Sequence, residues 1–280
     1  MVGYIGRRLA AIVPTLLIVT FVTFSLLELT PGDPAVTLAG EGATQEQIAE
    51  IRERLGLDRP FLIRYGEFLL GALHGDLGTS LFNSQPVLQA VFDRLPVTLS
   101  LVLYVFVLSI LLGVPAGVLA ARHPNTLIDR VVAVLASFSL AAPTFLIGMV
   151  LIVVLSLKLG LLPPMGYMSP FEDFGGWVSR LLMPAIALSM HPAAELARMT
   201  RAAMSDTLEK DYIRTARAKG LREPTIIRKH ALKNAAIPVI TVIGLQTARV
   251  LGGAVIIEQI FALPGIGTLT IQSVLTRDMA

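Results

Sequence analysis

The sequence has no cysteine and little charge. Only 15% of its 280 residues are Asp, Glu, Lys or Arg, whereas soluble globular proteins carry about 25%. The missing cysteines exclude disulfide bonds, thiolate metal sites and cysteine catalysis. The composition also excludes collagen-like and disordered chains, and a formal net charge of +3 gives no indication of a nucleic-acid partner. Hydrophobic residues make up 54% of the chain, which indicates a membrane protein.

Two enzyme motifs are also missing. The chain has no G-x-x-x-x-G-K-[ST] sequence, and none of its lysines is followed by Ser or Thr, so it cannot build that phosphate-binding loop. It has no G-x-S-x-G sequence either, which argues against an intramembrane hydrolase. The main alternative class is an ATP-independent secondary transporter or channel subunit, which would need ion-coupling acids in its membrane spans. Acids are nearly absent from the apolar stretches, which argues against this class.

Long apolar stretches are abundant. Four of them, residues 9–29, 97–121, 131–157 and 235–257, reach the length of about 20 residues that a membrane-spanning helix needs. A fifth, residues 181–194, is shorter and contains Pro184 and Pro192, so hydropathy alone leaves it open between a span and a re-entrant segment. A cleaved signal peptide is the alternative for the first stretch, but the stretch is longer than a signal h-region.

The distribution of charge predicts the sidedness. Residues 30–96 hold nine acids against five arginines, whereas residues 198–233 hold ten basic residues against four acids. By the positive-inside rule, the N-terminus and residues 198–233 are cytoplasmic and residues 30–96 are external. Residues 181–194 must then cross, which gives five spans. Because the fifth crossing leaves residues 258–280 outside, we expect a sixth span beyond this chain.

The external segment is predicted to contain two short helices. Thr44 and Gln47 form a capping box at the start of the first, and Gly56 ends it. The second begins with Pro60 and runs to residue 73, with an apolar stripe at helical spacing made of Phe61, Tyr65, Phe68, Leu69 and Leu73. The stripe would pack on the bundle or the membrane surface, or dock a partner. Glycines within the spans favour close helix packing: Gly113, Gly117, Gly148, Gly252 and Gly253.

The basic segment is predicted to form a helix over residues 206–219, a stop at Gly220 and a second helix opened by Pro224. Small residues stand beside cations near the end of the first helix, a pattern that suits docking on an acidic protein surface. A solvated loop that binds anionic membrane lipid is the alternative.

This segment resembles the cytoplasmic loop of permease subunits of binding-protein-dependent ABC importers. With Gly220 on the glycine of the loop pattern, Arg214, Thr215 and Ala216 fall on its Glu-Ala-Ala positions, and four positions of the general pattern differ. The sequence Tyr-Ile-Arg-Thr-Ala-Arg-Ala-Lys-Gly-Leu from Tyr212 is similar to the dipeptide, oligopeptide and nickel branch. Further fragments agree with that branch: Leu-Thr-Pro-Gly-Asp-Pro-Ala from Leu29, Gly-Asp-Leu-Gly-Thr-Ser from Gly75 and Leu-Gly-Gly-Ala-Val-Ile-Ile-Glu-Gln-Ile-Phe from Leu251.

The resemblance implies an all-α, polytopic helical bundle of the type I ABC importer permease in a bacterial cytoplasmic membrane. It implies one N-terminal region over residues 1–95, and a transmembrane domain over residues 96–280 with a coupling loop at 198–234. The implied partners are a second homologous permease, two ATPase subunits that bind ATP and Mg, and an extracytoplasmic substrate-binding protein; this chain itself would bind no cofactor. The implied ATPase contact is made by Tyr212, Arg214, Thr215, Ala216, Arg217, Ala218 and Gly220.

The implied substrate is a peptide, and nickel chelates, glutathione and oligosaccharides are the alternatives within the branch. Gln246 and Arg249 lie one helical turn apart in the last apolar stretch and share a face. We expect this face to line the translocation pathway, with Arg249 facing peptide carboxylates or paired with an acid such as Glu258. A structural pair with the second permease is the alternative.

Overall fold

The computed structural model describes residues 2–29, 33–40, 42–54, 56–276 and 278. Regular secondary structure in these residues is helical, and an isolated β-bridge joins Thr79 to Pro86. The chain forms two compact units, Met1–Asp93 with Thr270–Ala280, and Arg94–Leu269. We call them unit 1 and unit 2 and describe each by itself.

Unit 1 contains α1 (Val2–Leu29), α2 (Pro34–Ala39), α3 (Gln45–Arg54) and α4 (Phe61–Leu73). The capping box of α3 is confirmed, because the Thr44 amide donates to Gln47 and the Gln47 amide donates to Thr44 Oγ1. Gly56 ends this region with a φ of +64°, as predicted. The second helix begins one residue later than predicted, since Pro60 is its N-cap residue and not its first helical residue.

Aromatic side chains hold α4 against α1. The rings of Phe61 and Tyr65 pack edge-on against Phe21, with centroid distances of 5.6 and 5.3 Å. The Tyr65 hydroxyl also hydrogen-bonds Thr20 on α1 at 3.0 Å. The predicted apolar stripe of α4 therefore packs on the first helix of its own chain.

An ion pair connects α2 and α3. Asp33 is the N-cap residue of α2 and accepts a hydrogen bond from the Ala35 amide, and its carboxylate also pairs with Arg52 of α3. The hydrogen bond from Arg52 holds the pKa of Asp33 below its usual value. The pair therefore persists at mildly acidic pH and is lost only as pH falls through this lowered pKa.

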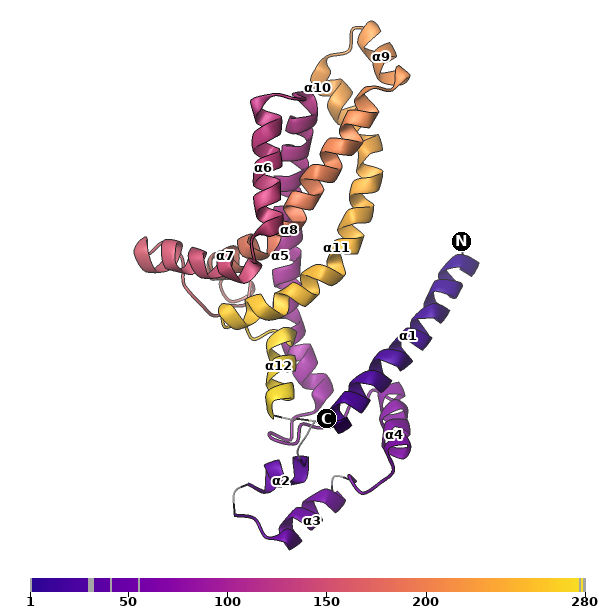
Figure 1. Cartoon of the computed structure of the whole chain (residues 1–280), viewed down its shortest axis with the longest axis vertical. Coiled ribbons are helices and arrows are strands. Elements are labelled where there is room, and N and C mark those ends of the chain that lie inside the picture. The colour runs from indigo at the N-terminus through magenta and orange to yellow at the C-terminus, as the bar shows by residue number, and fades with distance from the viewer. Residues whose placement is uncertain (1, 30–32, 41, 55, 277, 279–280) are drawn as a thin grey trace. The chain divides into compact units, whose positions relative to one another are not determined.

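Unit 2 is built around α8 (Phe174–Leu208), a helix of 35 residues that packs against α6 (Leu127–Ala141), α7 (Thr144–Leu151) and α11 (Leu232–Ile260). Figure 1 shows α6, α8 and α11 side by side, with α7 projecting to one side of them and α5 (Val87–Arg122) behind. The remaining elements are η1 (Ile152–Lys158), α9 (Asp211–Ala218), α10 (Glu223–Thr225), η2 (Ile226–Ala231) and α12 (Ile266–Thr276), which continues into unit 1.

Two apolar clusters fill unit 2. The first joins α5, α8 and the end of α11 through fully buried residues such as Leu101, Met183 and Phe261. The second lies where α8 ends and α11 begins, and contains Met204, Ile213, Ile226, Ile227, Ala216 and Ala231. This second cluster anchors the segment that was predicted to dock a partner.

Three helical stretches in the described residues are long and apolar enough to cross a membrane: Gly6–Leu26, Val87–Arg122 and Glu223–Ile260. They contain the predicted spans at residues 9–29, 97–121 and 235–257, apart from a few end residues. The predicted span at 131–157 is not one straight helix, because α6 and the helix that follows it meet at a bend of 101°, as in a broken span or a re-entrant loop. Pro143 explains the bend, since the residue before a proline is pushed out of the helical region, and Ala142 is extended.

The segment at residues 181–194 is the buried middle of α8. Residues 181–194 lie inside one helix about 52 Å long. By length and composition, α8 is not among the described stretches that are apolar enough to cross a membrane. Its crossing stays a prediction.

Candidate functional site

The predicted docking segment contains a separate short helix, α9. Its first turn carries Asp211 and its last turn carries Arg217, the signs that the helix dipole favours at the two ends. Gly220 follows with a φ of +77°, as a glycine stop requires. The expected continuous helix over 206–219 is wrong, because α8 ends at Leu208 and Lys210 is extended. This break lets the chain turn, so that α9 packs back onto the second apolar cluster.

α9 has a buried face and an exposed face. Ile213 is fully buried and Ala216 is 7% exposed, and both pack within the second apolar cluster. The methyl group of Ala216 contacts its own chain, and the contact of Ala216 with an ATPase stays a prediction. The other predicted contact residues are exposed: Tyr212, Arg214, Thr215, Arg217, Ala218 and Gly220.

Polar contacts connect α9 to the start of α11. The Asn234 amide of α11 donates to the Tyr212 hydroxyl at 2.8 Å. Arg217 Nε donates to the Glu223 carboxylate of α10 at 2.7 Å. Together with the buried Ile213, these contacts connect α9 to α10 and to the beginning of α11.

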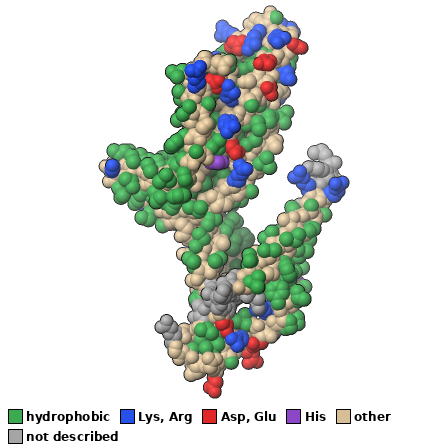
Figure 2. Space-filling view, in the orientation of Figure 1, with side chains coloured by type: hydrophobic (Ala, Val, Ile, Leu, Met, Phe, Trp, Pro, Cys, Tyr) green, Lys and Arg blue, Asp and Glu red, His purple; other side chains and the backbone are tan. Residues whose placement is uncertain are grey.

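A second polar group lies midway along α8 and α11, around Glu195. Arg249 Nη1 donates to Glu195 Oε1 at 2.9 Å, and the Gln246 side-chain amide donates to Glu195 Oε2. His191 Nε2 is 3.8 Å from Glu195 Oε1, one helical turn away. The side chain of Arg249 is 67% exposed, so the ion pair is open on one side. Figure 2 shows basic, acidic and histidine side chains together on this face.

The expected pairing of Arg249 with Glu258 is wrong, because the acid that Arg249 meets is Glu195. Glu258 is fully buried and has other partners. It accepts hydrogen bonds from the Thr98 hydroxyl at 2.6 Å and from the Thr268 amide at 2.9 Å. These bonds hold the turn between α11 and α12 against α5. Gln246 is also buried, at 2% exposed.

Sequence reasoning missed Glu195. It lies just beyond the apolar stretch 181–194, so hydropathy assigns it to no span. Its i, i+4 spacing from His191 was the available signal, because residues four apart share a helix face. Its pairing with α11 is a contact between residues 54 positions apart, which no local pattern predicts.

Comparisons with known families cover nearly the whole chain. Residues 113–280 match the family described as "binding-protein-dependent transport system inner membrane component". Residues 1–102 match the family of the N-terminal region of such membrane components. The first match covers more than half of the chain.

Curated relatives align over almost all of the chain. A putative peptide transport system permease protein of Brucella abortus is 42% identical over 100% of this chain and 89% of its own length. A dipeptide transport system permease protein of Alkalihalophilus pseudofirmus is 38% identical over 99% of this chain and 90% of its own length. A glutathione transport system permease protein of Escherichia coli is 39% identical over 99% and 88%, respectively.

The fold has a solved counterpart. A chain of the MetNI methionine ABC transporter, in an inward-facing conformation, superposes with a TM-score of 0.54. The match covers 68% of this chain and 82% of the other, with 19% sequence identity. At this identity the similarity concerns the fold alone, and it agrees with the all-α bundle expected from the sequence.

Proposed function

The chain belongs to the family of binding-protein-dependent transport system inner membrane components, and we propose from this premise that it carries peptides inward. It is a multi-pass permease subunit of an ABC importer. The names of its relatives, which include peptide, dipeptide and glutathione permeases, support a substrate with a peptide bond and a free carboxylate. Nothing in these names supports nickel or an oligosaccharide.

The energy for transport comes from partner subunits in this proposal. The chain lacks the G-x-x-x-x-G-K-[ST] loop that holds nucleotide phosphates. Two ATPase subunits would bind ATP and Mg, a second homologous permease would complete the membrane part, and an external binding protein would deliver the peptide. The N-terminus and residues 198–234 face the cytoplasm, supported by the ten basic residues against four acids at 198–233.

The observation that carries the coupling proposal is the two-faced helix α9. Its buried residues hold it on the second apolar cluster, while Arg214, Thr215 and Ala218 stay exposed. A helix of this kind can enter a cleft of an ATPase without unfolding its own anchor. Because Tyr212 is bonded to Asn234 at the start of α11, a tilt of α9 is transmitted to α11. The nucleotide state of the ATPase can shift the conformation of the helical bundle only if α9 packs differently against the ATPase in the different states.

The pathway proposal rests on the Glu195 group. Arg249 and Glu195 present opposite charges from α11 and α8, and a peptide carries both charges at its termini. The peptide carboxylate would compete with Glu195 for Arg249, supported by Gln246 behind the pair. Glu258 contributes indirectly in this proposal, by holding the end of α11.

The coupling proposal is tested by placing a charge on the exposed face of α9. Ala218→Asp adds an acid where an acidic cleft is expected, without touching the buried Ile213 or Ala216. The transporter is solubilised through a tag on this chain, and its ATPase subunits are quantified by mass spectrometry. We expect Ala218→Asp to lose the ATPase subunits and retain the second permease.

Ala202→Asp is the matched control, because Ala202 is also exposed but lies on α8. It should retain every partner. Retention of the ATPase subunits by Ala218→Asp, with transport intact, would exclude α9 as the contact. If no ATPase accompanies the unmodified chain either, the proposed energy source is wrong.

A further inference from the structure

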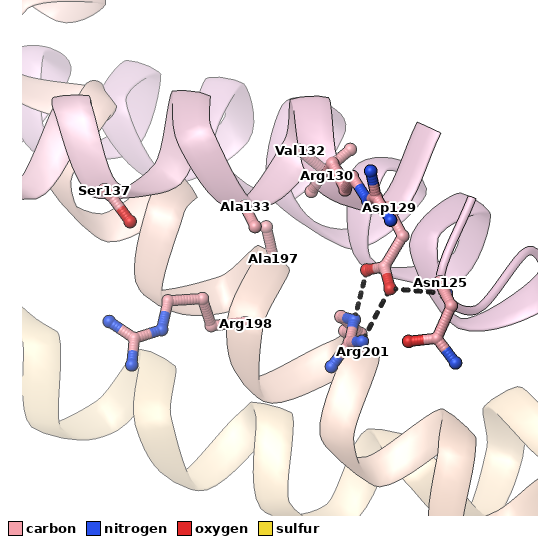
Figure 3. A pocket seen from close by; sticks show the side chains of 9 residues that line it. All are labelled: Asn125, Asp129, Arg130, Val132, Ala133, Ser137, Ala197, Arg198 and Arg201. Atoms are coloured by element: carbon pink, nitrogen blue, oxygen red, sulfur yellow. Dashed lines mark hydrogen bonds and ion pairs between the residues drawn. The ribbon is translucent and has the colours of Figure 1, made fainter. Parts of the chain in front are cut away.

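A basic pocket lies between the first three turns of α6 and the facing part of α8. Its volume is about 560 Å³, within the range of small-ligand pockets. Figure 3 shows the side chains of both helices around one space, with Ser137 and Arg198 at one end and Asn125 at the other. The lining residues are Asn125, Asp129, Arg130, Val132, Ala133, Ser137, Ala197, Arg198 and Arg201.

The aspartate of this pocket, Asp129, already has hydrogen-bond partners within the protein. Arg201 donates to Asp129 through Nε at 2.5 Å and through Nη2 at 2.7 Å. The Asn125 amide donates to the same carboxylate at 3.0 Å. With both oxygens of Asp129 occupied and its side chain buried, this acid has little capacity left to neutralise another cation.

Two arginines of the pocket remain available. In the part of the chain that the structure describes, neither the Arg130 side chain nor the Arg198 side chain has a hydrogen bond or an ion pair, and both residues are exposed. The lining contains three arginines and one aspartate, so its formal charge is 3 − 1 = +2. A pocket with this charge favours an anion, and guanidinium groups bind phosphate with two parallel hydrogen bonds.

The surroundings indicate where the anion comes from. The pocket begins at Asn125, just before the N-terminal end of the apolar helix α6, and lipid headgroups lie at the ends of such helices. The side of α6 away from α8 is exposed and apolar, through Leu127, Ile128, Val131, Val134, Leu135 and Phe138. A ligand with a phosphate in the pocket could therefore lay its acyl chains along α6.

We propose that this pocket binds the phosphodiester of an anionic glycerophospholipid, with Arg130 and Arg198 as the phosphate ligands. The two side chains lie toward opposite ends of the pocket (Figure 3), and because both are exposed they can turn toward a phosphate bound between them. Arg201 positions the site through its pair with Asp129. Basic pockets between membrane helices are suited to such headgroups. This inference is independent of the transported solute and of the ATPase contact, because none of the lining residues belongs to α9 or to the Glu195 group.

The test compares two double variants with the same loss of charge. Arg130→Gln with Arg198→Gln removes the two phosphate ligands and keeps the Arg201–Asp129 pair. Arg228→Gln with Lys229→Gln removes two exposed basic residues outside the pocket. The assembled transporter, purified in detergent, is titrated with phosphatidylglycerol, and bound lipid is counted by native mass spectrometry.

We expect the pocket variant to bind phosphatidylglycerol about 30-fold more weakly, because each basic side chain near its lipid contributes a factor of about five and two are removed. We expect the control to lose less than about threefold. Equal losses in both variants, or no loss in the pocket variant, overturn the proposal. So does a lipid effect seen with the isolated chain and absent from the assembled transporter, because a partner subunit would then cover the pocket.

Two further measurements complete the test. Inorganic phosphate is titrated against the lipid-loaded transporter, and displacement at equal concentration would assign the site to a free anion and overturn the lipid proposal. Ser137→Leu fills the pocket without changing its charge and should also reduce lipid binding by at least about fivefold. The Ser137→Leu variant keeps the proposal testable if the double variant does not fold.

Discussion

At the scale of single residues, two residues one turn apart on a helix have different roles because one is buried and the other is exposed. Gln246 is 2% exposed and supports Glu195 from behind, whereas the Arg249 side chain is 67% exposed and faces outward from the same pair. A charge that is paired and still accessible can exchange its partner at modest cost, since exposed ion pairs contribute only about 0–1 kcal/mol. This makes Arg249 the residue at which peptide recognition is best tested.

Arg249→Gln should raise the KM for a transported peptide about tenfold, because it removes a charge-assisted hydrogen bond to the carboxylate. The C-terminal amide of the same peptide is the control substrate, since it has no carboxylate to lose. Uptake of both is measured in proteoliposomes that contain the assembled transporter. We expect the variant to affect the acid and to leave the amide nearly unchanged.

An equal loss for the acid and the amide would contradict the recognition role of Arg249. The role would also be contradicted if Arg249→Gln reduced assembly with the second permease while the complexes that still form transported the peptide normally. That result would favour a structural pair between the two permeases.

At the scale of elements, the approach of α5 to α8 depends on two glycines one turn apart. A Cβ atom on Gly113 would lie 2.5 Å from the Ala193 carbonyl oxygen, and one on Gly117 would lie 2.5 Å from the Ala197 carbonyl oxygen. The sequence prediction of close packing is confirmed at these two positions. At Gly252 of α11, nothing in the described structure lies within 4 Å of such an atom, so Gly252 is not needed for packing within this chain.

Gly117→Ala should destabilise the transporter by about 1–3 kcal/mol, the usual cost of forcing extra volume into a packed core. The clash is with backbone and with Thr200, which cannot rotate away as a flexible side chain would. Gly252→Ala, with open space around it, is the matched control and should be neutral or slightly stabilising. Thermal unfolding of the two purified variants, followed by circular dichroism, checks both. Equal midpoints would show that α5 and α8 are not in close contact.

At the scale of the whole molecule, the proposed transport cycle requires that a movement of α9 reach the Glu195 group. The structure offers a continuous route within unit 2: the Tyr212–Asn234 hydrogen bond leads into α11, which carries Arg249 about 22 Å further along. α9 is also anchored to α8 through the apolar contact of Ile213 with the cluster around Met204. Both helices that bear the charged pair are thus connected to α9.

Tyr212→Phe should uncouple ATP hydrolysis from transport while the complex still assembles. One hydrogen bond contributes about 0.5–1.5 kcal/mol, so peptide transported per ATP should fall by about two- to tenfold. Tyr65→Phe removes a hydroxyl that bonds Thr20 in unit 1 and serves as the control. Uptake and ATP hydrolysis are measured on the same proteoliposomes. An unchanged ratio in Tyr212→Phe would exclude this hydrogen bond as part of the route.

Much of the molecule is determined by the sequence itself. The capping box at Thr44, the stops at Gly56 and Gly220 and the apolar stretches are local features, because they depend on residues within a few positions or on composition over about 20. The family also follows from motifs that the chain carries in order. For these features the neighbouring residues are sufficient.

Other features were decided only by the tertiary structure. The partner of Arg249 is Glu195 and not Glu258, Ala216 faces its own chain, and the basic pocket forms where α6 meets α8. Each depends on which helix faces are turned toward one another, and contacts between residues tens of positions apart fix those faces. Local sequence patterns place a side chain on a helix face, but they do not say which other helix covers that face.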